Sequence, residues 1–171
     1  MGRDSKSEIV ALYEAFFEKV YRHCAYRLLS KELAEDATSS VFVRLVECYP
    51  AIRKRGEMWI RNWLFGTASN VVASYQREGL RRRRAAQELS REKEHPRDEV
   101  AGAQEQLDQP RICDAIQRLP SLDQAVVVLR HLEGLESPAI AKALGMTRIG
   151  VRVRLYRAMK ALRRELGVTH G

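Results

Sequence analysis

The sequence predicts an all-α protein: two small helical domains joined by a flexible linker, the C-terminal one a helix-turn-helix domain. Hydrophobic residues recur every three or four positions along most of the 171 residues, whereas the alternation typical of strands is almost absent. The stretch 85–110 has few large apolar side chains and cannot build a core. These observations predict domains over residues 1–84 and 111–171, with an acidic linker over 85–110 between them.

Three apolar stripes at helical spacing predict the helices of the first domain. The stripes consist of Ile9, Tyr13, Phe16, Val20, Cys24 and Leu28, then Leu33, Ala37, Val41, Leu45 and Cys48, then Ile60, Leu64, Ala68, Val71 and Tyr75. Proline and glycine disfavour helix interiors, so Pro50, Gly56 and Gly79 are expected to interrupt the helices.

Basic residues are concentrated in two blocks. The chain has 30 Lys and Arg against 22 Asp and Glu, a net charge of +8. Residues 52–84 have 9 basic and 2 acidic groups, residues 142–171 have 8 and 1, and the linker has 3 and 7. Two cationic surfaces separated by an acidic segment predict a polyanionic partner such as nucleic acid. Alternatively, each basic run is the solvated face of a helix.

The second domain contains a helix-turn-helix pattern. Ser137 is expected to cap a short helix with Pro138 in its first position, Gly145 to end it, and Thr147 to cap a helix from Arg148 to about Leu166. The second helix of such a pair enters the DNA major groove. Its inner face is Val151, Leu155, Met159 and Leu162. The alternative is an ordinary amphipathic helix with a basic solvent side.

Several function classes are not expected. No apolar run is long enough to cross a membrane, and the N-terminus has no export signal, so we expect a cytoplasmic protein without membrane insertion. Three cysteines without a CxxC pair predict neither disulfides nor a zinc site, and no cofactor is expected. A metal-dependent nuclease would need Glu32, Glu35, Asp36 and His23 together, but no phosphate loop or nucleophile motif accompanies them. We therefore expect no enzyme, no catalytic residues and no metal.

Ordered motifs in both halves resemble the extracytoplasmic-function (ECF) subfamily of bacterial RNA polymerase sigma factors. The second half resembles the −35-binding domain through Leu119-Pro120, Glu133-Gly134-Leu135, Ile140-Ala141, Leu144-Gly145 and the run Val151-Arg152-Val153-Arg154-Leu155-Tyr156-Arg157-Ala158. The first half resembles the domain that binds the polymerase clamp and the −10 element, through Leu12-Tyr13, Phe16-Phe17, Val20-Tyr21, Ala34-Glu35-Asp36, Val41-Phe42-Val43-Arg44, Trp63-Leu64-Phe65 and Asn70.

The resemblance implies an alternative sigma factor that directs promoter recognition, DNA melting and transcription initiation. The expected −10 contacts are Arg53, Lys54, Arg55, Trp59, Arg61, Asn70, Arg77, Arg81, Arg82, Arg83 and Arg84. The expected −35 contacts are Arg148, Arg152, Val153, Arg154, Tyr156 and Arg157. The expected polymerase contacts are Glu35, Asp36, Ser39, Ser40, Phe42 and Arg44. Asn70 could read a flipped base, because an amide both donates and accepts, whereas Trp59 is a stacking platform or a core residue.

The clamp-binding helix departs from the family pattern. Where relatives typically read EDLVQEVF, this chain has Ser39 and Ser40 in place of a glutamine and a carboxylate. One hypothesis is that phosphorylation of Thr38, Ser39 or Ser40 restores the negative charge and activates the factor. The implied partners are core RNA polymerase, promoter DNA, and an anti-sigma factor or a protein kinase. The alternative is a stand-alone helix-turn-helix regulator that does not bind polymerase.

Overall fold

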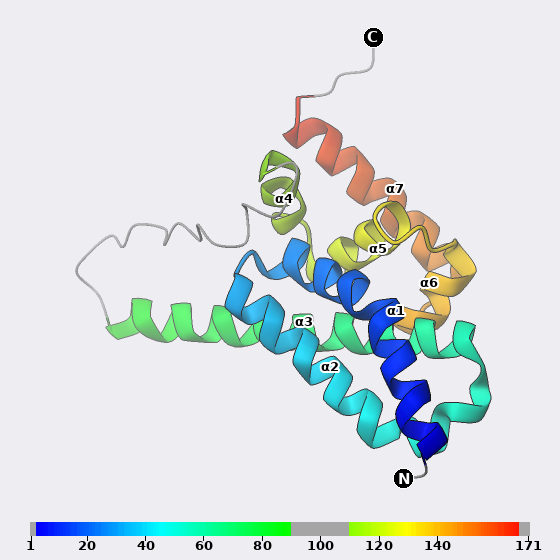
Figure 1. Ribbon diagram of the computed structural model, residues 1–171. Helices are drawn as coiled ribbons and strands as arrows, with labels where there is room; N and C mark the ends of the chain where they lie inside the picture. Colours follow the sequence, from blue (N-terminus) through cyan, green and yellow to red (C-terminus); the bar gives the residue numbers. More distant parts are fainter. Residues whose placement is uncertain (1–2, 90–109, 168–171) are drawn as a thin grey trace.

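A computed structural model describes residues 3–89 and 110–167 (Figure 1). Within these residues the secondary structure is helical and contains no strand, which confirms the all-α prediction. Residues 90–109, most of the expected linker, lie outside the described residues. None of the helices in the described ranges is both long and apolar enough to cross a membrane.

The N-terminal body contains α1 (Arg3–Leu28), α2 (Lys31–Ile52), a short 3-10 helix (Arg53–Arg55) and α3 (Glu57–Leu89). At the start of α2, the Ser30 hydroxyl accepts a hydrogen bond from the Leu33 N–H at 3.3 Å. Most residues of the predicted stripes meet between the three helices, where Val20, Val41 and Leu64 are fully buried, whereas Tyr13 and Leu33 are exposed. This confirms the periodicity-based helices.

Two of the three expected interruptions are wrong. Pro50 lies inside the last turn of α2, where it removes one backbone donor, and helical bonding resumes when the Arg53 N–H bonds to the Tyr49 carbonyl. Gly79 lies within α3. Gly56 does separate the helices, with φ of +81°, a conformation that glycine adopts without strain.

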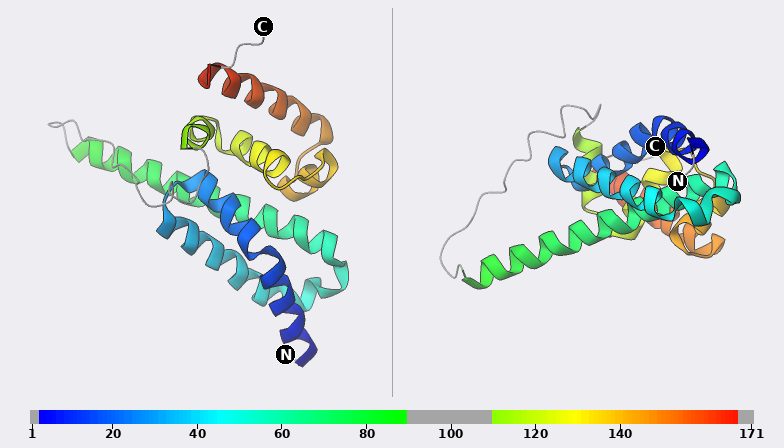
Figure 2. Two further views of the ribbon diagram at one scale, coloured as in Figure 1. Left: turned by 45° about the horizontal axis from the view of Figure 1, so that its top comes forward. Right: turned by 60° about the horizontal axis from the view of Figure 1, so that its bottom comes forward.

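Helix α3 extends five residues into the expected linker, since it ends at Leu89 rather than near Arg84. The sequence Ala-Ala-Gln-Glu-Leu that follows Arg84 consists of good helix formers, so polarity alone was a poor guide to its structure. The far end of α3 projects away from the other helices (Figure 2).

The C-terminal body contains α4 (Pro110–Gln117), α5 (Ser121–His131), α6 (Ser137–Leu144) and α7 (Arg148–Glu165). Helix α5 is buried over most of its length and packs against α7 and α6. One apolar cluster lies between α5, α6 and α7, and a second lies between α4, α5 and α7.

The two bodies are packed against each other (Figures 1 and 2). Helix α3 contributes Phe65, 1% exposed, to the apolar cluster of the C-terminal body, together with Val126 and Ile140. Next to it, Gly66 lies directly under α6: a Cβ atom at this glycine would be 2.3 Å from the Ala143 carbonyl oxygen. The absence of a side chain at Gly66 therefore allows α3 and α6 to touch.

Candidate nucleic-acid interface

Helices α6 and α7 form the expected helix-turn-helix. Gly145 ends α6 in the left-handed conformation, with φ of +63°, and the Thr147 hydroxyl accepts the Gly150 N–H at 3.0 Å to begin α7. One detail is wrong: Glu136, not Ser137, occupies the capping position. The helix begins one residue earlier than expected because the Ile140 N–H already bonds to the Glu136 carbonyl.

Helix α7 buries one face and exposes a basic one. Val151, Ala158 and Leu162 are buried against the core. Arg148, Arg152 and Arg157 are exposed, as are Val153 and Tyr156, which are 48% and 69% accessible. An exposed helix with arginines and an aromatic ring has the groups needed to contact phosphates and base edges. Five of the six predicted −35 contacts therefore lie on a free surface.

The sixth predicted −35 contact, Arg154, is engaged within the protein. Its Nη1 donates to the Asp123 carboxylate at 2.8 Å, and the Asp123 side chain is only 9% exposed. The pair ties α7 to the first turn of α5. Arg154 therefore holds the recognition helix on its domain, while its contact with DNA stays a prediction.

A groove of about 510 Å³ follows the N-terminal half of α3. The predicted −10 residues Trp59 and Asn70 both line it, and both are exposed. Two tryptophans and two amides in one groove could stack on an unstacked base and hydrogen-bond its edge. The groove is lined by Trp59, Asn62, Trp63, Gly66, Thr67, Asn70, Lys142 and Ala143.

The lining includes groups that sequence patterns did not indicate. Lys142 and Ala143 come from α6 of the other body. Neither periodicity nor charge runs could place α6 on α3, because the contacting residues Gly66 and Ala143 are 77 positions apart. Trp63 is half-buried: it packs on the core and also lines the groove.

Basic side chains adjoin the groove at the start of α3. Arg53, Lys54 and Arg55 form the exposed 3-10 helix, and the Arg55 guanidinium lies 5.6 Å from the centre of the Trp59 ring. Such a cation–π contact orients the indole while leaving charge on the surface. Arg61 is only partly exposed, with its Nε buried.

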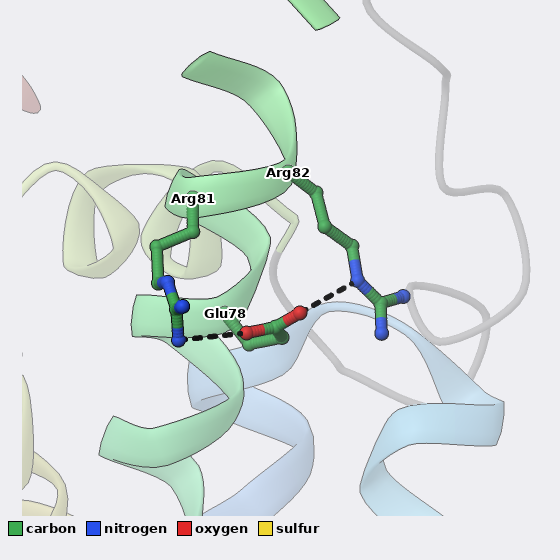
Figure 3. Close-up of polar contacts among 3 residues, drawn as sticks. All are labelled: Glu78, Arg81 and Arg82. Atoms are coloured by element: carbon green, nitrogen blue, oxygen red, sulfur yellow. Dashed lines mark hydrogen bonds and ion pairs between the residues drawn. The ribbon is translucent and has the colours of Figure 1, made fainter. Parts of the chain in front are cut away.

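The arginine run lies on the projecting end of α3. Arg81 and Arg82 donate to the two oxygens of Glu78, at 3.5 and 3.0 Å, while their side chains are about 80% exposed (Figure 3). Exposed pairs of this kind contribute little stability and exchange readily with other anions. The run therefore stays available to phosphate, together with exposed Arg77, Arg83 and Arg84.

The predicted polymerase-binding face of α2 divides into two sets. Glu35, Asp36, Ser39 and Arg44 are exposed, and Ser40 is partly exposed. Phe42 is 7% exposed and packs against the Tyr13 ring at 4.9 Å, so we correct it to a core residue. Helical spacing alone could not separate the core face of α2 from its edge.

Thr38 is not accessible to modification. The residue is fully buried, and its hydroxyl donates to the Ala34 carbonyl at 2.7 Å. We therefore withdraw Thr38 as a candidate phosphorylation site. Ser39 and Ser40, one and two residues further along α2, remain candidates.

The nuclease alternative does not form a site. His23 is fully buried beside Ser69 and Arg27, whereas Glu32 is exposed and bonds to Ser30. Within the described residues no group of three or more His, Cys, Asp and Glu side chains could hold a metal ion.

Comparison with known proteins identifies the family. Residues 111–162 match the model of the sigma-70 region 4 family. The chain is 30% identical to the ECF RNA polymerase sigma factor SigL of Mycobacterium tuberculosis, over 93% of this chain and 90% of SigL. It is also 30% identical to the ECF RNA polymerase sigma factor BldN of Streptomyces coelicolor, over 91% of this chain, and spans 59% of BldN.

A solved structure has the same fold. The sigma factor RpoE of Bartonella quintana, in complex with the anti-sigma factor NepR, superposes with a TM-score of 0.68 at 20% identity, covering 99% of this chain and 100% of that one. The sequence relatives match both helical bodies, which a stand-alone helix-turn-helix regulator does not explain. The chain belongs to the family of ECF RNA polymerase sigma factors.

Proposed function

We propose that this chain binds core RNA polymerase and directs it to promoters, where it supports DNA melting and transcription initiation. In this proposal α7 contacts the −35 element, the groove on α3 holds bases of the −10 element, and the exposed face of α2 docks on the polymerase clamp. The basic recognition helix carries the proposal, because its exposed arginines project from a helix-turn-helix that belongs to the family.

In vitro transcription with bacterial core polymerase on a promoter library tests the proposal. We expect transcripts only when the chain is added, and a pull-down should recover the chain with the core enzyme. A chain that binds promoter DNA but is not retained by the core enzyme would contradict the proposal and favour a stand-alone regulator.

Within the recognition helix, Arg152→Ala and Arg154→Ala should have different effects. Arg152 is exposed, so its loss should weaken −35 binding about 10- to 100-fold and leave stability unchanged. Loss of Arg154 leaves the Asp123 carboxylate buried without its partner and should cost about 1–3 kcal/mol of stability. Urea unfolding and DNA-binding titrations of both variants distinguish the roles; equal stability of the two variants would contradict the assignment of Arg154.

Two serines on the exposed face of α2 suggest how docking on the polymerase clamp is controlled. We propose that phosphorylation of Ser39 or Ser40 supplies the negative charge that relatives carry on this helix face. It is supported by the exposure of Ser39, the partial exposure of Ser40, and the adjacent carboxylates Glu35 and Asp36. Protein kinase and anti-sigma factor are the two proposed kinds of regulatory partner; the second is supported by the complex that RpoE forms with NepR.

Phosphomimetic variants test this control. Ser39→Glu and Ser40→Glu should bind the core polymerase about tenfold more tightly than the wild type, because a carboxylate at this position restores a charged contact. Ser39→Ala and Ser40→Ala are the matched controls, and their affinity for the core polymerase should not exceed that of the wild type. Unchanged or weaker binding of both glutamate variants would exclude the phosphorylation switch.

A further inference from the structure

The contact between the two bodies covers the middle of the face of α3 that would hold promoter bases. The positions of Trp59, Trp63, Gly66 and Asn70 recur every three or four residues and therefore share one side of α3. Trp59 and Asn70 are separated by about 16 Å along the helix axis. The Ala143 carbonyl of α6 lies against Gly66, between these two residues, and Lys142 lines the same groove.

Specific polar contacts hold this arrangement. Arg22 of α1 donates from Nε and Nη2 to the two oxygens of Glu133, at 3.1 and 3.0 Å. The Glu133 side chain is 1% exposed, so this bidentate pair is shielded from water on the acidic side. Burial raises the pKa of Glu133, while the hydrogen bond from Arg22 lowers it. Removing Arg22 would leave a buried carboxylate without a partner.

Further contacts extend along the boundary. Arg27 is 1% exposed, and its Nη2 donates to both the Ser121 carbonyl and the Ser121 hydroxyl at 3.0 Å. The Gln76 amide donates to Gln124 at 2.8 Å. These contacts are polar and lie beside the buried Phe65 ring, so the boundary combines one apolar anchor with hydrogen bonds and an ion pair. Polar contacts are common between domains that move relative to each other.

We propose that this packing is a closed, autoinhibited state of the sigma factor, in which α6 occupies the surface of α3 that the −10 strand needs. Opening exposes that surface, so the C-terminal body and single-stranded DNA compete for α3. The proposal rests on the proposed function, since it assigns the groove to promoter bases. It leaves the DNA-facing side of α7 free, because Arg148, Arg152 and Arg157 are exposed in the closed state.

Charge reversals at the Arg22–Glu133 pair test the proposal in the full chain. Neither residue belongs to the proposed DNA or polymerase contacts. Arg22→Glu and Glu133→Arg each place like charges together and should open the molecule, whereas the double reversal Arg22→Glu/Glu133→Arg should close it again. Small-angle X-ray scattering is expected to show a larger radius of gyration for each single variant and the wild-type value for the double variant.

The second readout is binding of fluorescein-labelled single-stranded DNA of randomised sequence. The Arg118–Glu165 ion pair, which lies inside the C-terminal body, supplies controls with the same charge changes. Arg22→Glu should bind this DNA at least about tenfold more tightly than Arg118→Glu, and Glu133→Arg more tightly than Glu165→Arg. The reason is that opening raises the fraction of molecules in which the groove on α3 is accessible to DNA. The two single variants change net charge in opposite directions, so non-specific attraction cannot explain a gain in both.

Three results would overturn the proposal. The wild type could be as extended as the single variants, the single variants could stay compact, or they could open without a gain in DNA binding over their controls. Circular dichroism checks that each variant is folded, and recovery in the double variant separates loss of the contact from damage to the fold. A pull-down with core polymerase reports the proposed function separately: failure there with intact opening would reject the sigma activity and not the closed state.

Discussion

Phe65→Ala is expected to destabilise the C-terminal body, although Phe65 belongs to a helix of the N-terminal body. The ring is 1% exposed and lies among Val126, Leu129 and Ile140, so truncation leaves a cavity between α3, α5 and α6. Truncations of buried phenylalanine cost about 3–5 kcal/mol, a large share of the stability of a small domain. Hydrogen exchange measured by mass spectrometry should show faster exchange of the α5 and α6 amides.

Phe16→Ala is the matched control. Phe16 is 3% exposed and packs in the core between α1, α2 and α3. We expect it to accelerate exchange mainly in α1 and α2, with a similar loss of free energy of unfolding. If Phe65→Ala left α5 and α6 as protected as in the wild type, Phe65 would not belong to the core of the second body.

Local patterns predicted the helices but not all of their ends, since Pro50 and Gly79 lie within helices. Val20, Val41 and Leu64, one from each of the three predicted stripes, are fully buried, and the residues expected inside α7 are buried or half-buried. Cap and turn residues predicted the boundaries of α6 and α7 to within one position. Gly145 ends α6 and Thr147 begins α7 through contacts with backbone atoms only a few residues away. Helical periodicity and helix caps depend on residues close together in the chain, so they can be recognised in a single sequence.

Contacts between distant segments could not be predicted in the same way. Phe65 follows Leu64 in the chain, yet Leu64 packs in the first core and Phe65 in the second. Arg154 carries the same charge as Arg152, and only the position of Asp123 on α5 distinguishes an internal ion pair from a free arginine. Phe42 was misassigned for the same reason, since its partners Tyr13 and Phe17 lie on another helix.

Acidification is expected to destabilise the protein through His23. The ring is fully buried; its Nε2 accepts from Arg27 Nη1 at 3.2 Å and lies 3.1 Å from the Ser69 hydroxyl. Burial, and then the charge of Arg27, holds the pKa of His23 well below the ordinary value of 6.5. A guanidinium can only donate, so Nε2 must remain unprotonated for this contact to persist.

The direction of the effect follows from proton uptake. Below about pH 6.5 the unfolded chain protonates His23 while the folded chain does not, so the free energy of unfolding falls by up to about 1.4 kcal/mol per pH unit until the native-state pKa is reached. Urea unfolding at a series of pH values should therefore show the free energy of unfolding falling as the pH is lowered below about 6.5. His23→Gln, whose amide oxygen can still accept from Arg27, should remove this part of the slope. His131→Gln is the comparison: partial burial and the charge of Arg130 also lower the pKa of His131, but this residue is exposed, so its variant should remove less of the slope than His23→Gln. Equal slopes for the wild type and His23→Gln would contradict the assignment.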